Sequence, residues 1–197
     1  MTLWEIANEM NSILWKSSQS HDRIIDYPWE NVIYYSNLFR WGHVEFYKYN
    51  TAEIVHCVIM PHSNDAAGIF GFDVIEINGN RTGLFMDITP TVGKPEKFIE
   101  GDLGDERDVP GWGAFSENFV AVKPNDGAPE KGLEVMQNYV NSSLQKSFGE
   151  KQEILSAQQS YVEMQRSNDK TFKMLKSHVG EEKAKKFMEE IMFPDVI

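Results

Sequence analysis

Four ionisable side chains lie in segments that otherwise suit the interior of a β-sheet. His43 and Glu45 are two positions apart, so the alternation of a strand places them on one face. His56 lies within the largely apolar run 53–60, and Asp73 lies in the next run of strand-forming residues. Buried imidazole and carboxyl groups are costly unless paired, but as pairs they can hold and transfer protons. The pattern indicates either a buried hydrogen-bonding network or a site of acid–base chemistry.

The turn at Asn50-Thr51 decides whether two of these groups meet. If it is a two-residue turn, Lys48 faces Glu53 on the neighbouring strand, which matches opposite charges. The same register sets Glu45 directly opposite His56. A three-residue loop would shift the register and separate this pair.

A second hairpin brings in the third group. Asn78-Gly79 is the strongest short hairpin signal in the chain, because both positions of a type I′ turn need positive φ. It returns residues 81–88 against the segment that holds Asp73, so Glu45, His56 and Asp73 are expected on adjacent strands facing one side. Each residue alone is more often a satisfied structural group, since structural networks also perturb pKa values. The three together leave both interpretations open.

Periodicity predicts helices around this meander of strands. Apolar residues at helical spacing in 3–14 predict an amphipathic helix that docks on the sheet. Ser167 is expected to cap one of the later helices, and residues 17–22 are expected to form a loop. Residues 91–108 are expected to form an acidic loop with a short helix. Further helices are expected at 133–144, 152–164, 172–180 and 181–192, and further strands at 30–35 and 118–122.

These elements predict an α/β fold, a three-layer α/β/α sandwich with a central antiparallel sheet. The N-terminal helix is expected on one face of the sheet and the C-terminal helices on the other. At 197 residues, the chain is expected to form a single domain, residues 1–197.

Composition restricts the classes of partner. A net charge of −11 argues against nucleic acid, which requires a basic surface. Residues 166–186 run against this charge, because they hold seven Lys and Arg against three acids. The sequence therefore predicts a local basic patch, where docking of an acidic partner would concentrate.

Cys57 is the single cysteine, which excludes a disulfide framework and an iron–sulfur cluster held by the chain's own cysteines. Any electrons would come from elsewhere. The first turns hold acidic residues and no apolar run approaches about 18 residues, so neither a signal peptide nor a membrane span is expected. The sequence predicts a cytoplasmic protein.

A set of short motifs, in order along the chain, resembles the ferredoxin-dependent bilin reductases. The similarity extends from about residue 35 to 195 and is specific only as a set; the first helix lies outside it. The motifs are HVEFYK (43–48), VHCVIMP (55–61), IFGFDVI (69–75), DITP (87–90), VPGWG (109–113), Tyr161-x₃-Gln165-x₂-Asn168-Asp169-Lys170-Thr171 and Phe193-Pro194-Asp195.

The resemblance implies an enzyme that binds biliverdin IXα between the sheet and the C-terminal helices, with no metal and no bound cofactor. Reduced ferredoxin would supply electrons singly, and the protein would supply protons to bilin radicals. The motifs are most similar to members that form phycocyanobilin by a four-electron reduction. The implied partners are biliverdin and ferredoxin. The protein is expected to be a monomer that binds neither nucleic acid nor a membrane.

The resemblance also implies roles for the polar residues already singled out. Asp73 matches an aspartate beside the pyrrole nitrogens, and His56 matches its histidine partner. Glu45 matches the glutamate that protonates the D-ring vinyl group, and His43 matches a histidine behind these groups. All four agree with the acid–base chemistry indicated by the residue pattern.

Four further positions are implied to contact the substrate. Arg107 and Lys170 match the cations that bind the two propionates. The planar guanidinium of Arg can bind a carboxylate with two hydrogen bonds, and Lys offers a mobile point charge, so both suit flexible propionates. Thr82 matches a hydroxyl near them. Asn168 matches a position that varies with the product formed.

Other functions stay open at this point. The same scaffold could form phycoerythrobilin, although Glu45 and Asn168 favour phycocyanobilin. A bilin-binding carrier without catalysis would need only cations and an apolar cleft, so the acid–base groups argue against it. A soluble α/β protein with a buried polar network would not explain the ordered motifs.

Overall fold

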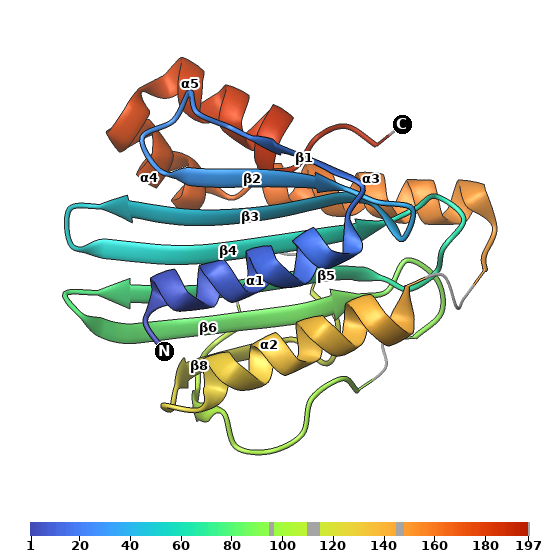
Figure 1. Cartoon of the computed structure of the whole chain (residues 1–197), viewed down its shortest axis with the longest axis horizontal. Coiled ribbons are helices and arrows are strands. Elements are labelled where there is room, and N and C mark those ends of the chain that lie inside the picture. The colour runs from blue at the N-terminus through green and yellow to red at the C-terminus, as the bar shows by residue number, and fades with distance from the viewer. Residues whose placement is uncertain (95–96, 110–114, 145–147, 197) are drawn as a thin grey trace.

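The computed structural model describes residues 1–94, 97–109, 115–144 and 148–196. Within these ranges one antiparallel sheet of eight strands lies at the centre, in the order β1-β2-β3-β4-β5-β6-β8-β7, and helices cover both of its faces (Figure 1). The predicted three-layer α/β/α sandwich is confirmed. The strands are β1 (Ser20–Arg23), β2 (Glu30–Tyr35), β3 (Phe39–Tyr49), β4 (Ala52–Pro61), β5 (Ile69–Ile77), β6 (Asn80–Thr89), β7 (Gly104–Glu106) and β8 (Val120–Pro124).

Two helices cover the near face of the sheet in Figure 1, and the remaining helices cover the far face. The near pair is α1 (Leu3–Ser17) and α2 (Ala128–Asn138), which continues as the π-helical turn η1 (Tyr139–Ser143). The far layer consists of α3 (Lys151–Arg166), α4 (Asp169–Val179), α5 (Glu181–Lys186) and the π-helical η2 (Phe187–Met192). None of the helices in the described ranges is both long and apolar enough to span a bilayer.

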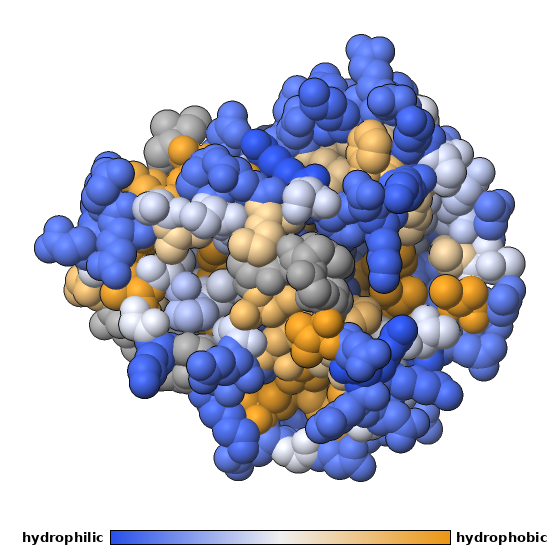
Figure 2. Space-filling model, turned by 180° about the vertical axis from the view of Figure 1, so that it is seen from behind, coloured by the Kyte–Doolittle hydropathy of each residue, from blue (hydrophilic) through white to orange (hydrophobic). Residues whose placement is uncertain are grey.

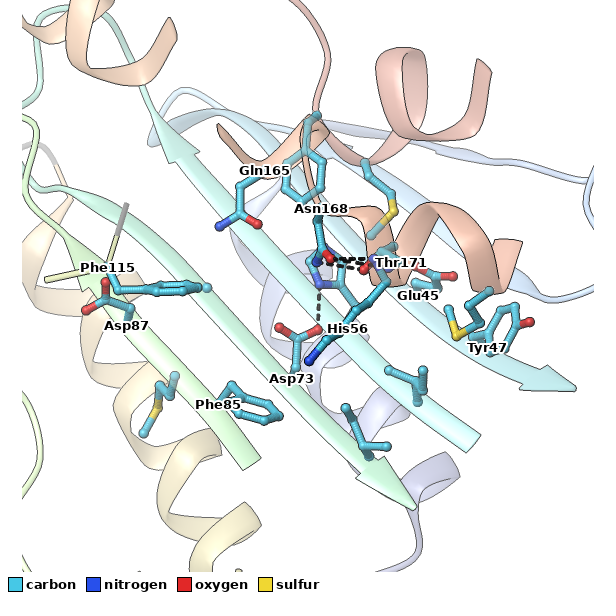
Figure 3. Close-up of a pocket in the computed structure, with 18 of the residues that line it drawn as sticks. Glu45, Tyr47, His56, Asp73, Phe85, Asp87, Phe115, Gln165, Asn168 and Thr171 are labelled. Carbon is cyan, nitrogen blue, oxygen red and sulfur yellow. Dashed lines mark hydrogen bonds and ion pairs between the residues drawn. The ribbon is translucent and has the colours of Figure 1, made fainter. Parts of the chain in front are cut away.

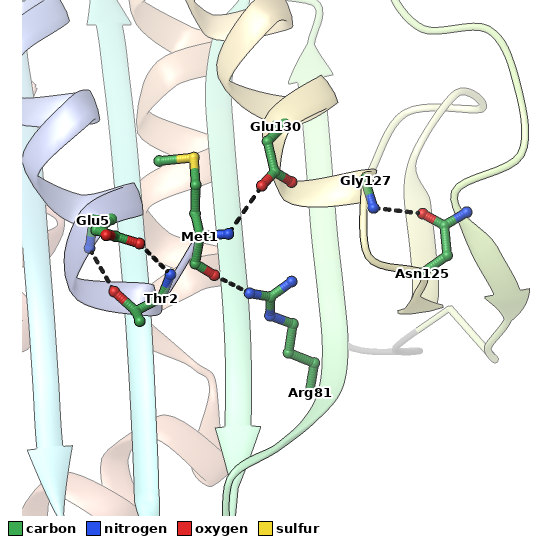
Figure 4. A network of polar contacts seen from close by, with 7 residues as sticks. All are labelled: Met1, Thr2, Glu5, Arg81, Asn125, Gly127 and Glu130. Atoms are coloured by element: carbon green, nitrogen blue, oxygen red, sulfur yellow. Dashed lines mark hydrogen bonds and ion pairs between the residues drawn. The ribbon is translucent and has the colours of Figure 1, made fainter.

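The sequence of α1 explains its start and its packing. Thr2 and Glu5 form a capping box, because the Glu5 amide donates to Thr2 Oγ1 at 3.2 Å and the Thr2 amide donates to Glu5 Oε2 at 2.7 Å (Figure 4). Each large apolar side chain removed from water contributes about 1.5–3 kcal/mol, so this one face holds the helix on the sheet. The buried residues are Leu3, Ile6, Ala7, Met10, Ile13 and Leu14, as predicted.

The helix predicted at 133–144 packs beside α1, and its expected place among the C-terminal helices is wrong. Gly132 accounts for its close approach to the sheet, because a Cβ atom there would lie 2.0 Å from Cε2 of Phe72 on β5. Glu130 of α2 also contacts the amino nitrogen of Met1 at 3.2 Å, and the Met1 carbonyl accepts from Arg81 on β6 (Figure 4). Helices α1 and α2 therefore form one layer.

Two predicted loops contain strands. Residues 17–22 were expected to be irregular, but β1 pairs antiparallel with β2 from Ser20 opposite Tyr35. All four residues of β1 are exposed, so the strand lacks the alternation that sequence reading depends on. In the acidic segment 91–108, the described residues contain the short strand β7 and not the expected helix. In both cases backbone pairing with a distant partner decides the conformation.

Alternation along the central strands divides the two faces. On β4, Val55 and Cys57 face the layer of α1 and α2, whereas His56 and Val58 face α3 and η2. The same alternation on β3, β5 and β6 sends apolar residues to the first face. It projects most of the chemically active side chains toward the second.

Candidate active site

Glu45, His56 and Asp73 lie side by side on three neighbouring strands. Glu45 of β3 pairs with His56 of β4, which pairs in turn with Asp73 of β5. The turns have the positive φ that tight hairpins need, with 52° at Asn50 and 53° at Asn78. The predicted register of Glu45 opposite His56 is confirmed. The pairing of His56 with Asp73 completes the row, and the three side chains gather beneath α4 (Figure 3).

A cavity of about 390 Å³ lies between this row and the C-terminal helices, within the size range of small-molecule sites. Seen from behind the view of Figure 1, the molecule shows hydrophobic side chains among hydrophilic ones (Figure 2). Apolar side chains of β4, β5, β6, α4 and η2 form most of the cavity walls. Seven of the predicted site residues line it: Glu45, His56, Asp73, Thr82, Arg107, Asn168 and Lys170.

Glu45 is a buried carboxyl group that can hold a proton near neutral pH. Its residue is 3% exposed. Burial raises its pKa to about 7, the Asp73 carboxylate adds to this effect, and His56 and the Trp29 indole oppose it. A carboxyl group with this pKa can donate a proton and be reloaded at physiological pH.

His56 and Asp73 form the one direct contact of the row. His56 Nδ1 lies 2.8 Å from Asp73 Oδ1, and the histidine side chain is 8% exposed against 38% for the aspartate. Burial alone would lower the pKa of His56, but the adjacent Asp73 carboxylate, with a contribution from Glu45, raises it above its ordinary value. The pair can therefore store a proton on the imidazole, next to a carboxylate that is open to the cavity.

His43 lies behind the row and does not line the cavity. Its ring centroid is 5.8 Å from that of His56, and neither ring nitrogen has a hydrogen-bond partner within the described ranges. Burial, together with the nearby His56, holds its pKa well below the ordinary value. His43 therefore lies behind the row and outside the set of residues that line the cavity.

Two cations stand at the rim of the cavity. Arg107 donates to the Thr82 carbonyl, and its guanidinium carbon lies 5.7 Å from the centre of the Phe85 ring. Lys170 is exposed at the start of α4. The VPGWG motif that follows Arg107 begins at the exposed Val109 and otherwise lies outside the described residues.

Asn168, and not Ser167, caps α4. Asn168 Oδ1 accepts from the amides of Lys170 at 3.1 Å and Thr171 at 3.3 Å, whereas Ser167 Oγ donates back to the Met164 carbonyl. The cap fixes the direction in which Lys170 and Thr171 leave the helix start. Asn168 thus borders the cavity and also orients α4.

Several cavity residues had no predicted role. Tyr161 and Gln165 are four positions apart and share one face of α3, and this spacing could have identified them. Asp87 shares the alternation of Phe85 on β6 and could have been found in the same way. Other aromatic lining residues come from the loop before β8, which periodicity does not reveal: Phe115 and Phe119.

Most of the basic residues in 166–186 are neutralised by nearby acids. Within the described ranges, Lys170 and Lys183 are the two that lack an ion pair within 4 Å. The number of Lys and Arg residues in this segment therefore overstates the positive electrostatic potential that an acidic partner would meet. The pairs are Arg166–Asp195 at 2.9 Å, Lys173–Asp169 at 3.2 Å, Lys176–Glu181 at 2.6 Å, Lys185–Glu189 at 3.9 Å and Lys186–Glu190 at 3.8 Å.

The described residues contain no group of three or more His, Cys, Asp or Glu side chains arranged to hold a metal ion. Glu45, His56 and Asp73 form a row along the sheet, which is not the convergent geometry of metal ligands. The arrangement suits proton storage and transfer beside an apolar ligand.

Comparison with known proteins relates this site to one family. The model of the family described as "Ferredoxin-dependent bilin reductase" matches residues 4–194. The chain is 27% identical over 185 residues to phycocyanobilin:ferredoxin oxidoreductase of Trichodesmium erythraeum (strain IMS101), covering 83% of this chain and 75% of the relative. It is 29% identical over 184 residues to the enzyme of that name from Synechococcus sp. (strain CC9902), covering 83% and 74%.

Solved structures show the same fold at lower identity. A protein named PcyX aligns over 100% of both chains with a TM-score of 0.70 and 19% identity. Phytochromobilin synthase from tomato, solved in complex with biliverdin, aligns over 97% of this chain and 81% of its own, with a TM-score of 0.61 and 12% identity. On the match of nearly its whole length to the family model, this chain belongs to the ferredoxin-dependent bilin reductases, a family of oxidoreductases.

Proposed function

We propose that this protein reduces biliverdin IXα to phycocyanobilin. Reduced ferredoxin would deliver four electrons one at a time, and the protein would deliver the four matching protons. The relatives of 27% and 29% identity support this product, because both are named phycocyanobilin:ferredoxin oxidoreductase. The biliverdin in the tomato structure supports the substrate.

The observation that carries the proposal is the row of Glu45, His56 and Asp73 against a mainly apolar cavity. A one-electron reduction makes a conjugated tetrapyrrole more basic, so each electron must be followed by a positioned proton. The row provides three proton-holding groups on rigid central strands. General acids placed in this way contribute about 10²–10⁴-fold to rate.

The environments of these groups suggest a division of roles. Asp73 is the most open to the cavity and contacts His56, so this pair would protonate the central pyrrole system. Glu45, at one end of the labelled row, would protonate the D-ring vinyl group (Figure 3). Its pKa of about 7 allows it to donate once a radical anion forms and then to regain a proton.

Substrate binding would use the rim and the walls. Arg107 and Lys170 would pair with the two propionates, with the Thr82 hydroxyl nearby. Asn168 would contact the bilin and influence which product forms. His43 would act from behind the row through His56, whose ring lies beside it.

We further propose a monomer without bound metal or organic cofactor that works in the cytoplasm. Ferredoxin would dock at the basic residues in 166–186, among which Lys183 lacks an ion pair within 4 Å in the described ranges and is not assigned to a propionate.

The test is anaerobic incubation of the protein with biliverdin, ferredoxin and a ferredoxin-reducing system, followed by chromatography of the bilin products. Phycocyanobilin as the final product would support the proposal. Phycoerythrobilin would keep the family chemistry and overturn the proposed product. Bound biliverdin that is never reduced would indicate a carrier.

A further inference from the structure

We infer that Asp87 is a positioning residue that holds an aromatic wall of the bilin cavity in place. Asp87 lies on β6 at the end of the cavity opposite Glu45, next to Phe115 (Figure 3). The inference rests on the proposed function, because the wall is argued to contact biliverdin. It adds a residue to which neither the motifs nor the general acid–base chemistry assigns a role.

Asp87 is a buried carboxylate whose oxygens are both engaged. It is 4% exposed. The Ser116 amide donates to Oδ2 at 2.8 Å, the Ser116 hydroxyl donates to Oδ1 at 2.5 Å, and the Thr89 hydroxyl donates to Oδ2 at 2.8 Å. Hydrogen bonds to an ionised acceptor are the strong ones in proteins. The carboxylate therefore serves as an acceptor that fastens Ser116 to the sheet.

Ser116 in turn orders the segment that follows it. Its hydroxyl accepts from the Asn118 amide at 3.1 Å, and its carbonyl accepts from the Phe119 amide at 3.1 Å. This turn has no helix or strand ladder of its own between Phe115 and the start of β8. The bonds between Ser116 and Asp87 tie this turn directly to β6 and so contribute to its placement against the cavity.

The fastened segment carries two of the three rings of the aromatic wall, which consists of Phe85, Phe115 and Phe119. The Phe115 and Phe119 rings are stacked, with centroids 4.0 Å apart and planes 28° apart. The Phe85 and Phe119 centroids are 6.3 Å apart with planes at 21°. All three rings line the cavity. Near-parallel rings form a surface suited to a flat conjugated ligand.

The wall lies at one end of the cavity and Glu45 lies at the other, so its position would limit how far a bilin can slide away from Glu45. Loss of the hydrogen bonds between Asp87 and Ser116 would loosen the aromatic wall without removing any of the three proton-holding groups. Substrate affinity and the spectrum of the bound bilin should then change more than the rate of the chemical steps.

The experiment measures equilibrium binding of biliverdin by visible absorbance, without reductant, for the parent and four variants. Asp87→Asn cannot accept at both positions, and Ser116→Ala keeps the carboxylate but loses one donor. Both should weaken binding by about tenfold or more, the loss expected for a hydrogen bond to a charged group. Both should also alter the bound spectrum. In separate turnover assays with reduced ferredoxin, both should raise KM for biliverdin more than they lower kcat. Ser116→Thr, which keeps the hydroxyl, should recover affinity relative to Ser116→Ala.

Asp65→Asn is the matched control. Asp65 is 2% exposed and accepts from the Ala67 amide at 3.1 Å, but it does not line the cavity. Its replacement should lower thermal stability and leave biliverdin affinity and spectrum unchanged. Parent-like binding by both Asp87→Asn and Ser116→Ala would overturn the inference. If Asp87→Asn does not fold, Ser116→Ala decides alone. A parent protein that fails to bind biliverdin would overturn the proposed function instead.

Discussion

The two faces of the central sheet are made by alternate residues of the same strands, yet their surroundings differ sharply. Toward α1 and α2, the side chains of Val55, Cys57, Phe72 and Val74 are fully buried in an apolar core. Toward α3 and α4, the intervening residues include His56, whose Nε2 lacks a hydrogen-bond partner in the described ranges. Both faces pack against apolar cores, but the face toward α3 and α4 also retains ionisable groups that are unfavourable to bury.

The difference shows how a sheet can tolerate a costly site. Burial of each large apolar side chain on the first face contributes about 1.5–3 kcal/mol, whereas an unsatisfied buried polar group costs about 1–3 kcal/mol. The apolar face also fixes the register, because a one-residue slip would expose it. That fixed register is what keeps Glu45 opposite His56 and His56 opposite Asp73.

The largest effect on turnover is expected from substitutions on the polar face, which is the face of the sheet toward α3 and α4. Asp73→Asn and His56→Gln should each lower turnover by about 10²–10⁴-fold, because the general acid beside the bilin is lost. Single-turnover reduction followed by electron paramagnetic resonance should show reaction stopping at an early bilin radical. Both variants should still bind biliverdin, which absorbance titration checks. Parent-like turnover in Asp73→Asn would mean that the central proton comes from another group.

The apolar face should show the opposite result. Phe72→Ala should lower the free energy of unfolding by about 3–5 kcal/mol, because the ring fills the space left by Gly132 on α2. Denaturant unfolding measures the loss. Turnover per folded molecule should stay near the parent value at low temperature. A fall in turnover as large as that of Asp73→Asn would show that the two faces are coupled and break the comparison.

The strand register could be predicted from sequence because it depends on local signals. Asn50 and Asn78-Gly79 encode tight turns, and two-residue turns fix which strand residues face each other. The pairing of Glu45 with His56 followed from the turn at Asn50, whereas alternation placed Asp73 on the same side without fixing its register against His56. Local chemistry also predicted α1, although the cap of α4 was assigned one residue too early.

The missing parts of the prediction depend on contacts between distant residues. Strand β1 consists of four exposed polar residues and exists because β2 offers it a partner. The side of the sheet taken by α2 depends on how Gly132 fits Phe72. The bonds from Ser116 to Asp87 join residues 29 positions apart across an irregular loop. No periodicity in the sequence encodes such contacts.

Glu45 gives a smaller effect that depends on pH. Its pKa is raised to about 7 in the folded protein, against 4.5 for an exposed glutamate. Between about pH 4.5 and 7 the unfolded chain loses this proton while the folded protein keeps it. The free energy of unfolding therefore falls as pH rises through this window, by up to about 3 kcal/mol, and levels off above it.

Glu45→Gln should remove this fall, so the stability difference between variant and parent should shift in favour of the variant from pH 5 to pH 8. Denaturant unfolding at several pH values measures it, with the exposed Glu134→Gln on α2 as control. Glu45→Gln should also bind biliverdin and accept an electron, but fail to reduce the D-ring vinyl group. Ordinary phycocyanobilin formed at the parent rate would make the assigned role of Glu45 wrong.

The smallest effect concerns the rim of the polar face, where charges contact solvent and contribute little to the fold. Arg107→Ala and Lys170→Ala together should weaken biliverdin binding more than either change alone, by about tenfold, because two flexible propionates lose their cations. Lys131→Ala on α2 is a matched control, since Lys131 pairs with Glu134 at 2.7 Å on the opposite face. It should leave binding unchanged. All four variants should unfold near the parent temperature. If the double variant binds as tightly as the parent, neither residue holds a propionate, and affinity must come from the apolar walls.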